Sequence, residues 1–306
     1  MRIPDYLSPT SVSLYYKDRS EFYVKYCADN RLPRLPQTEP MSVGSAFDAY
    51  IKNYIADRLG MPEASSDLDL DYLLTTQVEP QNMDFALRAG RDCFDQYCAL
   101  GAASNLMLEL EQAEKVCFEH TVQATMVDGS GMVLLGKPDL YFWADDVLHI
   151  YDWKVNGYCS ASMTSPNKGY VRMLASGSPT KTHKIAQVIG GIDVANKLED
   201  LNESWATQLA IYGWVLGGRD LVAGIDQLAC SAKGVRVASL RNKIGGAFQD
   251  ELYARCLTVW DAVQTGNVID PIIASELEAS AQAYVGVDDP GYNDHEAWYT
   301  DMMRQW

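Results

Sequence analysis

The chain has few positive charges: its 306 residues carry 25 Lys and Arg against 41 Asp and Glu, a formal charge of −16. This excess argues against a protein that coats nucleic acid non-specifically, because the phosphate backbone is itself a polyanion. No apolar run reaches the roughly 18–20 residues that cross a bilayer, so no membrane-spanning protein is expected. Hydrophobic residues nevertheless make up 47% of the chain. The length and the hydrophobic content together predict a folded protein with one large domain or two modest ones.

Cysteine pairs at metal-binding spacing are also lacking. The seven cysteines are odd in number and form no C-x-x-C motif, which favours reduced, buried thiols over a disulfide framework or a zinc ribbon. Residues 1–11 show no charged segment followed by an apolar one, so no secretory signal is expected. Both observations favour the cytoplasm of a bacterium or of a phage-infected host cell.

The negative charge is unevenly distributed along the sequence. Residues 1–35 carry a net charge of +2 and residues 157–248 a net charge of +4. Residues 36–156 carry −13 and residues 249–306 carry −9. A polyanion would therefore meet least repulsion at the first and third of these segments.

Helical spacing of apolar residues dominates the first third of the chain. It predicts an N-terminal helix capped by Ser8 or Thr10, a second helix over 42–59, and one or two helices within 82–110. The acidic residues 60–80 between them are expected to form a loop. Later in the chain, helices are expected over 205–216 and 248–263, and residues beyond these have weak helical patterning.

Between these helical parts the apolar period changes to two, which predicts strands over 116–126, 132–143 and 147–155. Asp128-Gly129-Ser130-Gly131 and Asp145-Asp146 are typical of the tight turns that join such strands. One further strand is predicted over 228–240. Residues 157–202 are rich in Gly, Ser, Pro and Lys and are expected to form a long loop or insertion, which in folded proteins is usually functional or mobile.

The most informative residues lie on two of the predicted strands. Asp152 and Lys154 are two apart and therefore share one face of a strand, whereas Trp153 points to the other face. A hairpin can bring Asp139, on the preceding strand, next to Asp152. Two close carboxylates favour a bound cation, and oxygen ligands suit Mg²⁺ or Mn²⁺. A neighbouring lysine can orient a water molecule and stabilise the charge that develops on a phosphate, which indicates metal-assisted phosphodiester hydrolysis.

These residues resemble the signature of the PD-(D/E)XK nuclease superfamily, with Pro138-Asp139 followed by Asp152-x-Lys154. Three other segments resemble the RecB-like exonuclease branch of that superfamily and follow its order. They are the N-terminal Leu7-Ser-Pro-Thr-Ser segment, Gly44-Ser-Ala-Phe-Asp48 in place of G-x-x-x-H, and Gln208-Leu-Ala-Ile-Tyr212 as Q-x-x-x-Y. The resemblance spans about residues 7–216.

The resemblance implies a role for each matching residue. Asp139, Asp152 and the backbone carbonyl of Trp153 would bind the metal, and Lys154 would be the catalytic lysine. Gln208 would reach the active site with support from Tyr212. Asp48 stands where relatives often carry a histidine ligand, and a carboxylate is also an acceptable ligand for a hard cation.

Simpler roles exist for several of these residues. Asp48 could be a solvated residue on the polar face of its helix, Gln208 an exposed amide, and Tyr212 a core residue. His149 precedes Asp152 by three positions, so a packing role on the opposite face is expected for it.

Some relatives bind an iron–sulfur cluster through four cysteines, three of them close to the C-terminus. Here the last cysteine is Cys256 and no C-x₂-C follows it. We therefore expect no iron–sulfur cluster.

Basic residues interleaved with aromatics indicate where DNA could bind, although solvated surface charge is the usual alternative. They cluster near the N-terminus and within the predicted insertion. The candidates are Lys17, Arg19, Lys168, Arg172, Lys181, His183 and Lys184.

Together these features predict an α/β protein with a restriction-endonuclease-like core: a central mixed sheet flanked by helices, a helical N-terminal part and a long insertion. We expect a nuclease domain over 1–264, with a helical lobe 1–110 and a catalytic core 111–264 that carries the insertion 157–202. An acidic extension would follow over 265–306.

The predicted function is Mg²⁺- or Mn²⁺-dependent hydrolysis of DNA, by an exonuclease that acts on DNA ends in recombination, repair or phage DNA processing. A recombination or helicase protein would be a partner, and no membrane is expected. A structure-specific or nicking endonuclease is one alternative. A non-catalytic module that binds DNA or a partner protein is another.

Overall fold

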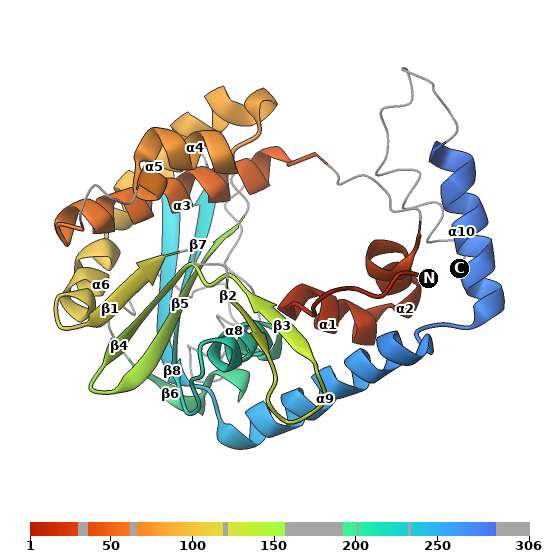
Figure 1. Cartoon of the computed structure of the whole chain (residues 1–306). Helices are drawn as coiled ribbons and strands as arrows, with labels where there is room; N and C mark the ends of the chain where they lie inside the picture. Colours follow the sequence, from red (N-terminus) through yellow and green to blue (C-terminus); the bar gives the residue numbers. More distant parts are fainter. Residues whose placement is uncertain are drawn as a thin grey trace. The chain divides into compact units, whose positions relative to one another are not determined.

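A computed structural model describes residues 1–29, 36–61, 66–118, 122–156, 192–200, 202–231 and 234–285. The chain divides into two compact units (Figure 1). Unit 1 is formed by Met1–Leu35, Val122–Gly136 and Ala247–Trp306, and unit 2 by Pro36–Thr121 and Lys137–Gly246. The chain thus enters each unit more than once.

Unit 2 contains a six-stranded mixed sheet in the order β1-β4-β5-β7-β8-β6. The pairs β5–β7 and β6–β8 are parallel, and the other neighbouring pairs are antiparallel. The strands are β1 Glu114–Phe118, β4 Leu140–Ala144, β5 Val147–Asn156, β6 Ile192–Lys197, β7 Val222–Ser231 and β8 Gly234–Lys243.

Helices flank this sheet. In unit 2 they are α3 Glu39–Arg58, α4 Leu70–Gln77, α5 Met83–Ala99, α6 Ala102–Leu110 and α8 Glu203–Val215, with short 3₁₀ turns η2 Ser66–Leu68, η3 Pro80–Asn82 and η4 Leu198–Asp200. Local signals set the starts of two of them. The Asp69 side chain accepts a hydrogen bond from the backbone of Tyr72, and Asn202 accepts one from Trp205.

Near its C-terminal end, strand β5 carries hydrophobic core residues on one face and the polar candidate residues on the other. Tyr151 and Trp153 point into a core built with α3, α5 and α6, and Figure 1 shows these helices together on that side. Asp152 and Lys154 alternate with them and therefore face the other side, where α8 contacts β5. His149 shares the face of Tyr151 and stacks on Phe142 with a centroid separation of 4.8 Å, which agrees with a packing role.

Close packing fixes α3 against α5. A Cβ atom added to Gly90 of α5 would lie 2.5 Å from the Cβ of Ala46 in α3, so only glycine allows this approach. Phe47 and Ile51 of α3 then pack into the core below. The helix that carries Asp48 is therefore held in position by the core.

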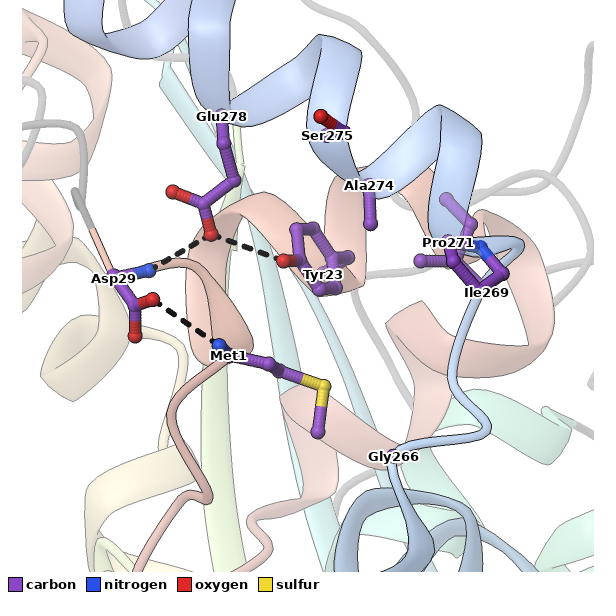
Figure 2. A pocket seen from close by; sticks show the side chains of 9 residues that line it. All are labelled: Met1, Tyr23, Asp29, Gly266, Ile269, Pro271, Ala274, Ser275 and Glu278. Carbon is purple, nitrogen blue, oxygen red and sulfur yellow. Dashed lines mark hydrogen bonds and ion pairs between the residues drawn. The ribbon is translucent and has the colours of Figure 1, made fainter.

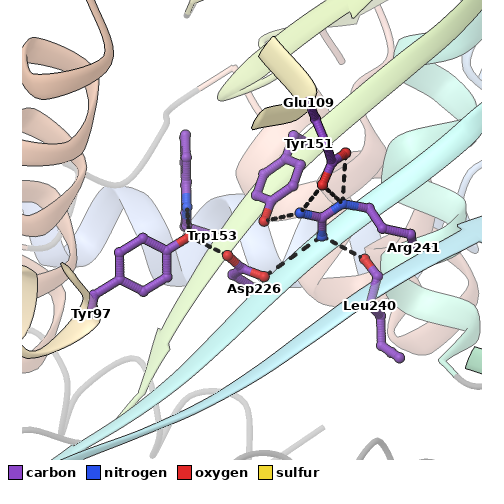
Figure 3. Close-up of polar contacts among 7 residues, drawn as sticks. All are labelled: Tyr97, Glu109, Tyr151, Trp153, Asp226, Leu240 and Arg241. Carbon is purple, nitrogen blue, oxygen red and sulfur yellow. Dashed lines mark hydrogen bonds and ion pairs between the residues drawn. The ribbon is translucent and has the colours of Figure 1, made fainter. Parts of the chain in front are cut away.

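Buried charges cross the core face of the sheet (Figure 3). Arg241 of β8 forms an ion pair with Glu109 at 2.9 Å, donates to the Tyr151 hydroxyl at 2.7 Å, and lies 3.7 Å from Asp226. Asp226 in turn accepts a hydrogen bond from the Tyr97 hydroxyl. This network links β5, β7 and β8 to the two helices α5 and α6.

Unit 1 combines helices with a small hairpin. Its elements are α1 Pro9–Lys17, α2 Arg19–Phe22, the π-helical turn η1 Tyr23–Cys27, β2 Val122–Thr125, β3 Val133–Gly136, α9 Gly246–Thr265 and α10 Pro271–Val285. Ser8 begins α1 in a reciprocal capping box with Ser11, as one of the two predicted caps. The β2–β3 pair is antiparallel around the turn at Asp128, as predicted.

Several predicted boundaries were wrong. The single strand expected over 116–126 is divided between β1 and β2, which belong to different sheets. The strand over 132–143 is likewise divided into β3 and β4, and 228–240 covers the hairpin of β7 and β8.

Two predicted loops also contain regular structure. Residues 60–80, expected to be a loop, hold α4 and two 3₁₀ turns. The predicted insertion 157–202 contains β6 and η4 at its end, and its residues 157–191 lie outside the described residues.

The predicted fold class is confirmed: the chain is an α/β protein with a mixed sheet flanked by helices and a helical N-terminal part. Within the part of the chain that the structure describes, no helix combines the length and hydrophobicity needed to cross a membrane.

Candidate active site in unit 2

The residues singled out on β4 and β5 come together in unit 2. Asp139 lies one residue before β4, where Leu140 pairs with Tyr151, so its register position is beside Asp152. The Asp139 carboxylate accepts a hydrogen bond from the backbone N–H of Trp153 at 3.0 Å. Sequence analysis expected Asp139 within a strand, whereas it occupies the bend that leads into β4.

A closed set of polar contacts joins β5 to α8. The Lys154 ammonium lies 2.6 Å from the Asp152 carboxylate and donates to the Gln208 amide oxygen at 2.8 Å. The Gln208 amide nitrogen is 3.2 Å from the other Asp152 oxygen and 3.0 Å from the Tyr212 hydroxyl. Because Gln208 and Tyr212 are four apart on α8, one helix face delivers both side chains.

Burial makes Asp152 an unusual carboxyl group. Its residue is 2% exposed, and the pKa is raised from 3.8 to about 7, first by burial and then by the nearby charge of Asp139. Lys154 and Lys52 oppose this shift, because their positive charges favour the carboxylate. Burial and the neighbouring carboxylate thus raise the pKa of Asp152 and make it a weaker acid than an ordinary aspartate.

Asp48 and Lys52 lie one turn apart on α3. The Lys52 ammonium forms an ion pair with one Asp48 oxygen, and its side chain is fully buried. The Asp48 side chain is 16% exposed, so it is not the fully solvated residue considered above. Lys52 also acts electrostatically on Asp152, which connects α3 to the β5 cluster.

The donor set has the chemistry that could hold a hard divalent cation. Asp139 and Asp152 offer carboxylate oxygens beside the Trp153 backbone, and such oxygens are the ligands that Mg²⁺ and Mn²⁺ take. A cation there would also relieve the burial penalty and the mutual repulsion that raise the Asp152 pKa. Among the described residues, however, no three Asp, Glu, His or Cys side chains form a ready-made metal cluster.

Lys52 was not among the residues predicted from the sequence. Its spacing of four from Asp48 was the available signal, but such pairs are common on exposed helix faces. Sequence analysis also gave no role to the Trp153 N–H, although this group orients Asp139.

The residues predicted to bind DNA are only partly described. Lys17 and Arg19 are exposed residues of unit 1, and Arg19 stacks over the Tyr15 ring at 4.7 Å. Lys168, Arg172, Lys181, His183 and Lys184 lie outside the described residues.

A pocket of about 460 Å³ lies in unit 1 between η1 and α10, and Figure 2 shows its lining. Its carboxylates already have donors: Glu278 accepts from the Tyr23 hydroxyl at 2.9 Å, and Asp29 pairs with the N-terminal amine at 3.1 Å. None of the predicted site residues lines this pocket. The candidate chemistry is therefore located in unit 2.

No family model matches the chain, and no curated protein matches it. Among solved structures, it is similar to an exonuclease candidate from Eubacterium rectale, with 14% sequence identity, a TM-score of 0.42, and coverage of 87% of this chain and 83% of that one. The protein SSO0001 gives 11% identity and a TM-score of 0.24 over 81% of this chain and 85% of that one. TM-scores this low do not establish shared ancestry, so the function is inferred from the site itself.

Proposed function

We propose that this chain is a Mg²⁺- or Mn²⁺-dependent deoxyribonuclease that hydrolyses phosphodiester bonds from DNA ends. The observation that carries the proposal is the contact set of Asp152, Lys154 and Gln208 next to Asp139. It combines two carboxylates and a half-buried ammonium group from the inner strands β4 and β5, or directly before them, with an orienting amide from α8. The motif order noted in the sequence supports the exonuclease over other nucleases.

In this proposal Asp139, Asp152, the Trp153 carbonyl and Asp48, which Lys52 also contacts, would hold the metal. When bound, the ion would supply Lewis-acid chemistry: polarisation of the phosphate and a lowered pKa for the attacking water. Lys154 orients the attacking water and stabilises the added negative charge on the phosphate. Gln208 holds the Lys154 ammonium in position, and the Tyr212 hydroxyl holds the Gln208 amide.

DNA would be held through its backbone by the basic residues of the predicted binding set, in which Lys17 and Arg19 are exposed. Since the whole chain carries −16, binding should depend on a local basic surface and weaken steeply with salt. The setting we propose is recombination, repair or phage DNA processing in a bacterial or phage-infected cytoplasm, together with a recombination or helicase protein.

End-labelled linear DNA and covalently closed circles, each with Mg²⁺, Mn²⁺ or EDTA, test the proposal. We expect loss of linear DNA only, dependent on the metal, and abolished in Asp152→Asn and Lys154→Met. Cleavage of circles would indicate an endonuclease instead. Absence of metal-dependent cleavage from every substrate would refute the enzyme and leave a binding module.

Two matched control variants distinguish the loss of a site residue from the general effects of the same kind of substitution. Asp145→Asn makes the same chemical change in the exposed β4–β5 turn, where φ is +51° and asparagine is well tolerated. Lys243→Met removes an exposed lysine at the end of β8. Both controls should keep the activity of the unsubstituted protein.

A further inference from the structure

A buried charged network lies on the core face of the sheet, opposite to the candidate site (Figure 3). Arg241 pairs with Glu109 and has Asp226 beside it, and both Arg241 and Asp226 are buried. Charges are costly to remove from water, and well-packed hydrophobic residues often replace such groups without loss of stability. Buried ionic groups are better known for fixing the register of packed elements, so the elements that this network joins indicate its use.

The network contacts β5 on both sides of Asp152. Arg241 donates to the Tyr151 hydroxyl at 2.7 Å, and its guanidinium lies 4.2 Å from the centre of that ring. Tyr97 of α5 accepts a long hydrogen bond, 3.5 Å, from the indole N–H of Trp153. The side chains before and after Asp152 are therefore both held from the core face of the sheet.

Asp226 connects these two contacts. Its carboxylate accepts from the Tyr97 hydroxyl and lies 3.7 Å from the Arg241 guanidinium. The Tyr97 hydroxyl has a single hydrogen, and because this hydrogen is donated to Asp226, the oxygen lone pairs are free to accept from Trp153. Asp226 is also the register partner of Trp153 in the parallel β5–β7 pair. An acceptor at this position thus sets the direction of the whole chain of hydrogen bonds.

Trp153 carries this arrangement through the sheet, because its two N–H groups have partners on different faces. The indole N–H donates to Tyr97 in the core, and the backbone N–H donates to the Asp139 carboxylate at 3.0 Å. Asp139 lies in the bend before β4, so a side-chain contact rather than strand pairing orients it. Side-chain rotamers are coupled to the backbone, so holding the indole also limits the tilt of the backbone N–H.

We propose that Asp226 and Tyr97 are positioning residues of the active site, which act from the opposite face of the sheet. They fix Trp153, and its backbone N–H then fixes the direction of the Asp139 carboxylate. The inference rests on the nuclease function proposed above. Neither residue touches the substrate, so their loss should slow the chemical step and leave DNA binding unchanged.

Tyr97→Phe tests the proposal, because it removes the hydroxyl and keeps the ring that packs on Phe47. Hydrogen exchange of the full chain in EDTA, followed by nuclear magnetic resonance, reports the Trp153 backbone N–H without any cleavage reaction. We expect this N–H to exchange about tenfold faster in Tyr97→Phe, when compared with the amides of α8 in the same sample. The single-turnover cleavage rate should fall about tenfold at an unchanged Kd for DNA.

Tyr23→Phe is the matched control. Tyr23 is also a buried tyrosine whose hydroxyl donates to a carboxylate, that of Glu278 at 2.9 Å, but it belongs to unit 1. The control loses the same kind of hydrogen bond and should lower stability in a similar way. It should leave the Trp153 exchange and the cleavage rate of the folded protein unchanged, which a general effect of destabilisation would not.

The outcomes separate this proposal from the nuclease function. Unchanged Trp153 exchange in folded Tyr97→Phe, or faster exchange with an unchanged cleavage rate, would overturn the positioning role while the nuclease remains. Faster exchange in a chain that cleaves no DNA would overturn the nuclease and support the link from Tyr97 to Trp153.

Two measurements keep the test decisive if Tyr97→Phe does not fold, as judged by circular dichroism. Asp226→Leu removes the acceptor, leaves Arg241 paired with Glu109, and should give the same faster exchange at Trp153. In the unsubstituted protein the Trp153 backbone N–H should be protected from exchange. If it exchanges like an unbonded amide, its bond to Asp139 is absent and the proposal is wrong.

Discussion

Ionisation of Asp152 should destabilise the metal-free protein. The folded chain keeps the Asp152 proton up to a pKa of about 7, whereas the ordinary value of 3.8 applies once the chain unfolds. Between these two values the folded state therefore binds more protons than the unfolded state. Its free energy of unfolding must fall as the pH rises through this window, because stability decreases wherever the native state holds the extra proton.

The size of the effect follows from the same shift. A displacement of about three pKa units corresponds to an upper bound of about 4 kcal/mol, at 1.36 kcal/mol per unit. Asp152→Asn removes the titrating group and leaves a neutral amide of the same shape. The free energy of unfolding of the variant minus that of the unsubstituted protein should therefore rise by up to about 4 kcal/mol between pH 4 and pH 8.

Urea denaturation in EDTA across this pH range measures the difference. Asp145→Asn, the exposed control in the β4–β5 turn, should keep a constant difference from the unsubstituted protein. Addition of Mg²⁺ at pH 8 should stabilise the unsubstituted protein and not Asp152→Asn, because the ion binds only the folded carboxylate. Profiles of the two proteins that stay parallel within about 0.5 kcal/mol would refute the argument, since a shifted pKa requires them to diverge.

Three further substitutions test other parts of the structure. Lys154→Met should lower the single-turnover cleavage rate about 10³-fold while Mn²⁺ binding persists; a rate within tenfold would contradict its role. Tyr212→Phe removes the hydroxyl that accepts from Gln208 and should slow cleavage about fivefold, the equivalent of about 1 kcal/mol; an unchanged rate in the folded variant would contradict its supporting role. Gly224→Ala places a Cβ 2.4 Å from the Tyr151 ring and should cost about 1–3 kcal/mol in urea denaturation, so an unchanged midpoint would exclude this clash.

Periodicity in the sequence located most elements but not all of their ends. Alternation continued through residues 116–126, although the chain passes there from the sheet of unit 2 to the hairpin of unit 1. Alternation of apolar and polar residues predicts a strand but does not say with which strand it pairs. It therefore cannot show where the chain leaves one sheet and enters another. The helix α4 was missed because the acidic residues around it indicated solvent, whereas Asp69 is its N-cap.

The candidate site was predictable where its residues share an element or a tight turn. The strand period put Asp152 and Lys154 on one face, and the helix period put Gln208 and Tyr212 on one face. Lys52 was not predictable in this way, because its burial depends on how α3 packs against α5 and β5. Burial of a charge is decided by tertiary contacts, which residue spacing alone does not contain.

The alternation of core and site residues along strand β5 limits which insertions and deletions the chain can accept. Its odd-numbered side chains Tyr151 and Trp153 complete the core, and its even-numbered side chains Asp152 and Lys154 carry the proposed chemistry. An insertion or deletion of one residue here would exchange the two sets and abolish both at once. Insertions and deletions in evolution or in a laboratory selection should therefore be tolerated only outside residues 151–154.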